Sequence, residues 1–119
     1  MNDKTATANL VGDKYIELTF LRENITLNAN EVKFGWKLAQ EISPQKSMNV
    51  LLKTGDSTLL DKKAREYVLA EFKEWPRVAI VVDNTGQRLM GQVIINLTGN
   101  SAKLKLFNNI NKAQEWIVS

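Results

Sequence analysis

A run of five apolar residues at positions 78–82 constrains the fold of this chain more than any other feature. The run reads Val-Ala-Ile-Val-Val and has no polar position. Successive side chains of a strand point to opposite faces, so a strand of this composition must be covered on both faces. Such strands are typical of the centre of a parallel sheet, where crossover helices pack on the two faces. The run therefore predicts an α/β fold with residues 78–82 at the centre of its sheet.

Helix and strand signals alternate along the rest of the chain. The expected elements are a hairpin over residues 8–22, strands over 48–52, 78–82 and 102–106, helices over 29–42, 58–75 and 87–97, and a short helix from 111 onward. The order β-β-α-β-α-β-α-β-α predicts one α/β domain with a mixed central sheet of about five strands and helices packed around it. We expect residues 1–7 to form a flexible N-terminus and residues 8–119 to form the domain.

Local signals fix several of these boundaries. Asn28 and Glu31 have the spacing of a capping box at the start of the first helix. Thr58 and Asp61 resemble a second capping box, which predicts that the next helix begins at Thr58. Two lysines that alternate with apolar residues in 102–106 are typical of a strand at the edge of a sheet.

The composition excludes several classes of site. The chain has no cysteine and no histidine, so disulfides, thiolate zinc sites and histidine-based catalysis are ruled out. Sixteen basic and thirteen acidic residues leave a net charge of +3, and the lysines are scattered, so we expect no nucleic-acid binding. The first residues are polar and the longest apolar run has five residues, so we expect a cytoplasmic chain with no stable membrane insertion. No cofactor motif or metal-ligand pattern is expected.

Two segments carry a resemblance to a known family. One is the central strand at residues 77–83, Arg-Val-Ala-Ile-Val-Val-Asp, which follows a helix. The other is the ending at 106–117, where a phenylalanine precedes a helix with an alanine and a Trp-Ile pair. With a hairpin followed by helix–strand repeats over residues 8–118, the chain resembles the STAS domain in its SpoIIAA-like branch.

The resemblance implies a domain that binds a protein partner and is not an enzyme, similar to the antagonists of anti-sigma factors. In regulatory members, a kinase phosphorylates a Ser or Thr in the pattern Asp-Ser-Ser/Thr-Gly at a helix start. Asp56, Ser57 and Thr58 match this pattern, whereas Leu59 replaces the glycine. Ser57 and Thr58 are therefore phosphoacceptor candidates, because a helix N-terminus stabilises a phosphate. The alternative for both hydroxyls is simple capping of the helix.

Phe34 and Leu38 lie off the apolar stripe of the first helix. They could form a partner surface, or a neighbouring segment could cover them. The resemblance implies that the partner surface borders this helix, so Phe34, Leu38 and Asp56 are the candidates for partner contact. The partner would be a kinase or anti-sigma-like protein, or a second copy of the chain.

An alternative function is the binding of a small apolar, lipid-like ligand. The resemblance implies this alternative because some SpoIIAA-like relatives are proposed to hold apolar ligands in the manner of the CRAL-TRIO fold. Trp36, Phe72 and Met90 are then the candidate pocket residues. The segments 54–57 and 83–86 follow neighbouring strands, so they are expected to share one rim at the carboxyl ends of the sheet. Their two aspartates could hold a hard cation, although ordinary turns and caps account for both.

Glu71 falls near the apolar stripe of the second expected helix. It could be a perturbed carboxylate in a pocket. The simpler interpretation places it at the edge of the stripe, paired in solvent with a basic residue such as Arg77.

Overall fold

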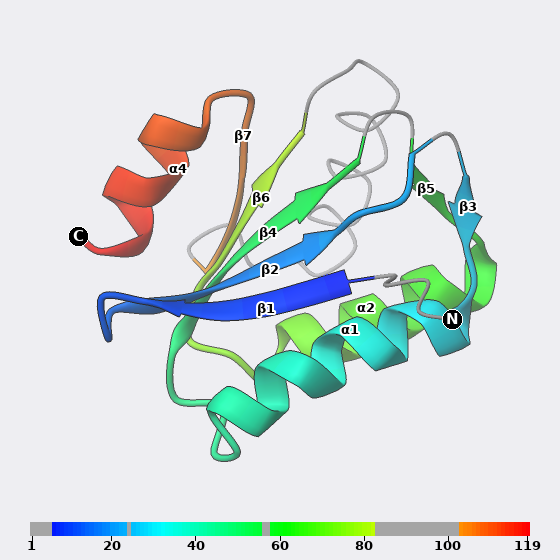
Figure 1. Ribbon diagram of the computed structural model, residues 1–119, viewed down its shortest axis with the longest axis horizontal. Helices are drawn as coiled ribbons and strands as arrows, with labels where there is room; N and C mark the ends of the chain where they lie inside the picture. The colour runs from blue at the N-terminus through cyan, green and yellow to red at the C-terminus, as the bar shows by residue number, and fades with distance from the viewer. Residues whose placement is uncertain (1–5, 24, 56–57, 83–102) are drawn as a thin grey trace.

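A five-stranded sheet crosses the middle of the computed structural model, which describes residues 6–23, 25–55, 58–82 and 103–119 (Figure 1). Its strands are β1 (Ala6–Val11), β2 (Tyr15–Phe20), β4 (Asn49–Thr54), β6 (Val78–Val81) and β7 (Leu104–Phe107). They lie in the order β1-β2-β4-β6-β7, with β1 antiparallel to β2 and every other neighbouring pair parallel. The predicted α/β domain with a mixed five-stranded sheet is confirmed.

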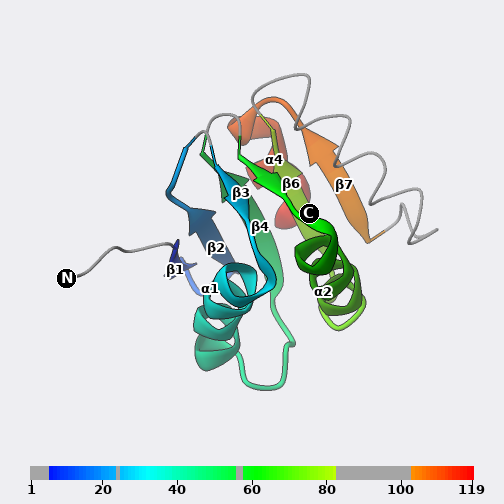
Figure 2. The ribbon, with the colours of Figure 1, turned by 90° about the vertical axis from the view of Figure 1, so that its right-hand side faces the viewer.

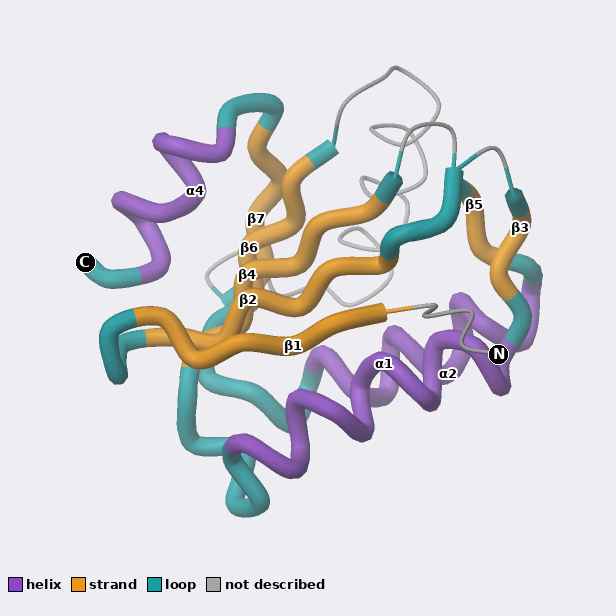
Figure 3. Tube along the Cα trace, in the orientation of Figure 1, coloured by secondary structure: helices purple, strands orange, loops and turns teal. Residues whose placement is uncertain are grey.

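The described helices lie on opposite faces of this sheet. Helices α1 (Ala29–Ile42) and α2 (Lys62–Phe72) pack side by side on one face, and α4 (Ile110–Ile117) covers part of the other (Figure 2). Two short strands, β3 (Thr26–Leu27) and β5 (Leu59–Leu60), form a separate parallel pair that the sequence did not predict (Figure 3). The helix expected over 87–97 lies outside the described residues.

Strand β6 is buried on both faces, as predicted, but the middle strand of the described sheet is β4 and not β6. Its neighbours are β4 and β7, so it is an interior strand of the sheet. Val78, Ile80 and Val82 belong to the core beneath α1 and α2, whereas Ala79 and Val81 belong to the smaller core beneath α4. An apolar residue is required at each of these positions because neither face reaches solvent.

The hairpin that joins β1 to β2 has the expected turn. Gly12 and Asp13 have φ values of 55° and 56°, and the Lys14 N–H donates to the Val11 carbonyl at 2.9 Å. Two consecutive residues with positive φ match the twist of the flanking strands. The strand itself begins earlier than predicted: Ala6 and Thr7, assigned to the flexible terminus, pair with Phe20 and Thr19.

Helix α1 has the predicted bounds and the predicted capping box. Asn28 Oδ1 accepts a hydrogen bond from the Glu31 N–H at 2.9 Å, and Glu31 Oε1 accepts one from the Asn28 N–H at 3.0 Å. Val32 and Trp36 are fully buried on the inner side. Gly35 lies so close to the sheet that an added Cβ would be 2.5 Å from the Phe20 ring and 3.3 Å from Ala6 Cβ.

The predicted start of α2 was wrong. The helix begins at Lys62 rather than Thr58, and Asp61 caps it by accepting a hydrogen bond from the Ala64 N–H at 2.8 Å. Before the cap, the Leu59 N–H donates to the Ile25 carbonyl and the Asp61 N–H donates to the Leu27 carbonyl, both at 3.0 Å. Because this pairing holds the backbone extended, the helix cannot start before Asp61.

Candidate functional site

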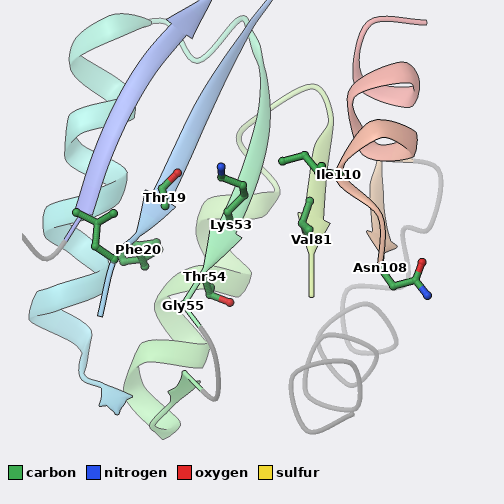
Figure 4. A pocket seen from close by; sticks show the side chains of 9 residues that line it. Thr19, Phe20, Lys53, Thr54, Gly55, Val81, Asn108 and Ile110 are labelled. Carbon is green, nitrogen blue, oxygen red and sulfur yellow. The ribbon is translucent and has the colours of Figure 1, made fainter. Parts of the chain in front are cut away.

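An open cleft lies at the carboxyl ends of three neighbouring strands, β2, β4 and β6. It encloses about 500 Å³. Its described lining is Thr19, Phe20, Leu21, Lys53, Thr54, Gly55, Val81, Asn108 and Ile110 (Figure 4). In open α/β sheets this edge is the usual place for a ligand. The cleft is therefore the first candidate site on this chain.

Polar and apolar groups share the floor of the cleft. Thr19, Lys53 and Val81 lie on the α4 face of adjacent strands. Lys53 Nζ is 3.7 Å from Glu17 Oε1, and both side chains are partly exposed. Ile110, the first residue of α4, closes one side. A ligand in this cleft would meet a cation and hydroxyl groups beside aliphatic surface, which suits a molecule with both polar and apolar parts.

The predicted rim is only partly within the described residues. Thr54 and Gly55 line the cleft, at the end of β4. Asp56, Ser57 and the segment 83–86 lie outside the described residues, and so do the two aspartates considered for a cation. Among the residues the structure describes, no group of three or more acidic side chains could hold a metal ion.

Thr58 lies in a different setting from the one predicted for a phosphoacceptor. Its side chain is buried, with 5% of its surface exposed, and its hydroxyl donates to the Arg22 carbonyl at 2.6 Å. It precedes β5 and lies four residues before the first residue of α2, so it does not cap that helix. Its hydroxyl therefore ties the segment after β4 to the segment after β2.

The outer side of α1 is the second candidate site. Phe34 has 49% of its surface exposed, whereas Leu38, one turn later, is half-buried against the core. The structure thus separates the predicted pair: Leu38 joins the packed interior, and Phe34 projects from it. Strand β1 runs beside this helix at the edge of the sheet (Figure 1).

Two of the predicted pocket residues belong to a closed aromatic cluster. The rings of Trp36 and Phe72 meet edge to face with centroids 5.8 Å apart, and the Trp75 ring is 5.9 Å from Trp36. All three side chains are at most 4% exposed, and none of them lines the cleft. The Trp36 Nε1–H has no hydrogen-bond partner among the described residues. Met90 lies outside those residues.

Glu71 is buried rather than paired in solvent, so the simpler interpretation of this residue was wrong. Its side chain is 7% exposed, and Oε1 accepts hydrogen bonds from Gln40 Nε2 at 2.9 Å and Trp75 Nε1 at 3.1 Å. Its ion-pair partner is Lys46, whose Nζ is 3.1 Å from the same oxygen. Arg77 instead donates to the carbonyls of Trp116 and Ser119, each at 3.1 Å.

The Glu71 carboxylate perturbs two neighbouring groups. Burial lowers the pKa of Lys46, but the hydrogen bond and charge of Glu71, together with Glu74, outweigh burial and raise that pKa above its ordinary value of 10.5. Burial also raises the pKa of the Tyr67 hydroxyl, and the charge of Glu71 raises it further. The cluster lies between α1 and α2, away from the cleft. It joins the two helices through the contacts of the Glu71 carboxylate.

Some lining residues of the cleft were not predicted from the sequence. Thr19 and Lys53 lie one position before a strand end, and Asn108 precedes α4. Their common signal is a polar residue at the carboxyl end of a strand or just after it. That signal could have identified them once the strand order was known, because only the order brings β2, β4 and β7 to one edge.

Within the described part of the chain, no helix is long and apolar enough to span a bilayer.

Comparison with known proteins supports the fold and gives no activity. A family model described as Domain of unknown function (DUF7793) matches residues 13–119. A solved structure, an uncharacterized protein from the DUF3478 family with a SpoIIAA-like fold from Shewanella loihica PV-4, is similar over 98% of each chain, with a TM-score of 0.64 and 19% sequence identity. No curated protein matches the chain. The fold is therefore SpoIIAA-like, as the sequence resemblance implied.

Proposed function

The chain belongs to the DUF7793 family, and from its SpoIIAA-like fold and the exposed surface of α1 we propose that it is a non-enzymatic domain that binds a protein partner through the outer side of α1. The observation that carries the proposal is the exposed ring of Phe34. Aromatic side chains are enriched at protein interfaces, where burial of a large rigid ring contributes strongly to affinity.

The surroundings of Phe34 support this role. Leu38 continues the apolar surface from Phe34 toward the core, while Lys33 and Lys37 on the same helix are exposed. Such a surface has an apolar centre and a polar rim, which is the usual organisation of an interface. Neither Phe34 nor Lys37 is needed for the internal packing of α1, whose buried residues are Val32, Gly35, Trp36 and Ala39.

Affinity capture with paired variants tests the proposal. Phe34→Asp places a charge at the centre of the surface, and Val118→Asp is the matched control, because Val118 is also 49% exposed but lies at the end of α4. We expect the wild type and Val118→Asp to retain the same specific partner, identified by mass spectrometry, and Phe34→Asp to lose it. Equal capture by all three proteins, after circular dichroism shows that each is folded, would refute a role for α1.

A phosphorylation switch remains part of the proposal, at Ser57 or Thr58. The buried hydroxyl of Thr58 donates a hydrogen bond to Arg22, so phosphorylation there must first break this contact and open the segment. Glutamate at position 58 would place a charge in the same buried setting, which destabilises the fold. The informative substitution is therefore Ser57→Glu, with Thr58→Val as a control that removes only the hydroxyl.

The cleft supports a second candidate function, the binding of a small molecule. We expect a ligand with an anionic or polar group near Lys53 and an aliphatic part near Val81 and Ile110, rather than a wholly apolar lipid. Native mass spectrometry of the purified chain tests for a retained ligand. Ile110→Trp would fill the cleft and remove an added mass, and the exposed position Val118→Trp serves as the control. An added mass that persists in Ile110→Trp would place the ligand elsewhere.

A further inference from the structure

The unpaired edge of β1 is unlike the opposite edge of the sheet. Among the described strands, β1 has β2 as its single neighbour, so its other edge is free of strand pairing. Its sequence, Ala-Thr-Ala-Asn-Leu-Val, contains neither charge nor proline. By contrast, the edge strand β7 carries Lys105 and follows Lys103. Charges and prolines are the usual means by which an edge strand avoids pairing with another chain, and β1 lacks both.

The side chains of β1 on the α1 face change from buried to exposed along the strand. Ala6 is 4% exposed beneath α1, Ala8 is half-buried, and Leu10 is 44% exposed. Leu10 lies opposite Ile16, a core residue, so it points to the α1 face. The core beneath α1 ends before Leu10, so this apolar side chain is exposed beside the free edge of β1.

We propose that a second copy of this chain pairs with that edge, β1 against β1 in antiparallel orientation, and joins the two sheets into one. The proposal rests on the protein-binding function above and names the partner as the chain itself. A two-fold axis perpendicular to the sheet keeps α1 of both copies on the same side. Directly opposed residues must share a face, and we choose the register that meets this condition with Ala8 of one copy opposite Ala8 of the other, because it is the one that covers Leu10. In this register Leu10 lies opposite Ala6 of the second copy.

This register covers the exposed apolar groups. Gly35 lies over Ala6, since its missing Cβ would be 3.3 Å from Ala6 Cβ. Leu10 of one copy therefore approaches α1 of the second copy near Gly35, beside the exposed ring of Phe34. The same contact occurs twice, because the axis exchanges the two copies. Each copy thus supplies both the exposed leucine and the surface that receives it.

The exposed charges of α1 fit the same axis. Helix α1 runs in the same direction as β1 (Figure 1), and Gly35 of α1 lies over Ala6 of β1. The residue of α1 that lies over Ala8 can therefore be found by counting along the helix from Gly35. Two strand residues advance about 6.6 Å, which corresponds to roughly four residues of helix and leads to residue 39. The exposed Lys37 and Glu41 lie two residues on either side of that level. An axis there places Lys37 of one copy at the level of Glu41 of the other, on the outer face of the two helices, so the opposite charges attract in both halves of the dimer.

Sedimentation velocity of the full chain over a wide concentration range tests the proposal. We expect the wild type to form a species of twice the 13.5 kDa chain mass, and Leu10→Lys to abolish it. Val118→Lys is the control, since it adds the same charge at an equally exposed position on α4. A wild type that stays monomeric throughout, or a dimer lost in Val118→Lys but kept in Leu10→Lys, overturns the proposal.

A cysteine cross-link tests the register even if Leu10→Lys fails to fold. The natural chain has no cysteine, so Ala8→Cys has one thiol per copy. Opposed Cα atoms in an antiparallel pair are about 4.5–5.5 Å apart, within the range of a disulfide. We expect Ala8→Cys to form a covalent dimer on mild oxidation and Val118→Cys to remain monomeric on denaturing gels. Equal or absent cross-linking in both variants contradicts the register.

Charge reversal tests the α1 contact. Lys37→Glu and Glu41→Lys each place like charges together twice, and from the strength of exposed ion pairs we expect each to weaken the dimer about five-fold. The double variant Lys37→Glu/Glu41→Lys should restore the wild-type affinity. Failure of the double variant to recover overturns this arrangement of α1. If the wild type stays monomeric but still captures another protein through Phe34, the dimer proposal is wrong and the proposed function stands.

Discussion

The buried carboxylate of Glu71 is contacted by three described side chains. Gln40 from α1, Trp75 after α2 and Lys46 from the loop after α1 all donate to the same oxygen, Oε1. Each donor comes from a different segment, so the contact fixes how α1, its following loop and the end of α2 meet. Removal of this acceptor is costly because the buried Trp75 Nε1–H loses its hydrogen-bond partner, whereas Lys46 keeps Glu74, whose Oε1 is 3.6 Å from Nζ.

Replacement of Glu71 should therefore destabilise the fold strongly. We expect Glu71→Ala to lower the free energy of unfolding by about 2 kcal/mol, since a hydrogen bond to a charged group contributes about 1.5–3 kcal/mol. Glu71→Gln should cost less, because an amide oxygen can still accept from Trp75. Glu66→Ala, at an exposed position of the same helix, is the control. Urea titrations measure all three, and an effect of Glu71→Ala no larger than that of Glu66→Ala would contradict the assignment.

The raised pKa values of Lys46 and Tyr67 predict a loss of stability in alkaline solution. In both cases the folded chain holds the proton more tightly than the unfolded chain. The stabilisation is present below the unfolded pKa, about 10.0 for Tyr67 and 10.5 for Lys46, and is lost as the pH rises through the folded pKa. We expect the thermal midpoint to fall above pH 10.

The variant Tyr67→Phe isolates part of this effect. The phenylalanine ring cannot ionise, so the alkaline decrease of the thermal midpoint should be smaller than in the wild type. An identical decrease in both proteins would mean that Tyr67 does not contribute.

The sequence indicated that Glu71 lies near the apolar stripe but not what it binds. Its partner Lys46 lies in the loop after α1 and has a φ of 52°, a conformation that is uncommon for a residue other than glycine. A contact of this kind depends on the path of a loop, which spacing along α2 does not contain. Similarly, nothing in the local sequence near Thr58 indicates that its hydroxyl reaches the Arg22 carbonyl 36 residues away.

At the scale of elements, the sequence predicted the bounds of α1 correctly and the start of α2 incorrectly. The start of α1 depends on Asn28 and Glu31, which lie three residues apart and satisfy one another. The segment before α2 contains several residues able to cap a helix, among them Thr58, the predicted start, and Asp61. The choice between them is made by pairing of β5 with β3, a contact between distant segments. The sequence thus predicted the start of α1 correctly because the residues that stabilise it are close together in the chain.

Ile117 is the larger of the two fully buried side chains of helix α4, the other being Ala113. Ile117 is fully buried against the sheet, whereas the next residue, Val118, is 49% exposed. We expect Ile117→Ala to lower the free energy of unfolding by about 2–4 kcal/mol, because it leaves a cavity in the small core beneath α4.

The adjacent Val118→Ala is the control and should change stability by less than about 0.5 kcal/mol, as usual for exposed positions. Chemical denaturation followed by circular dichroism provides the comparison. Similar effects of the two substitutions would show that α4 does not pack as described.

At the scale of the whole molecule, the layer order follows from the residues of β6. Its fully apolar sequence required cover on both sides, and the structure supplies α1 with α2 on one side and α4 on the other. The position of the cleft could not be predicted so directly, since it depends on the order β2-β4-β6 and on where α4 begins. Strand order is a property of the folded sheet, and periodicity within one strand does not determine it.

Amide hydrogen exchange should follow this layer order. We expect the slowest exchange in β4 and β6, which are paired on both sides and buried on both faces. The outward amides of β1 should exchange faster in dilute samples and become protected as concentration rises, because pairing of two copies would cover them. Exchange in β1 as slow as in β6 at every dilution would contradict an open edge.

The three tryptophans of the chain are divided between the two sides of the sheet. Trp36 and Trp75 contact each other beneath α1 and α2, while Trp116 on α4 lies beside Phe107 and under the Arg77 guanidinium. Intrinsic fluorescence can therefore distinguish the sides without any attached dye. In a Trp116→Phe variant the remaining emission arises from the α1–α2 side alone, and the difference from the wild type reports the departure of α4. A denaturation experiment that follows the fluorescence of both the wild type and Trp116→Phe would then show whether the two sides of the sheet unfold together or in sequence.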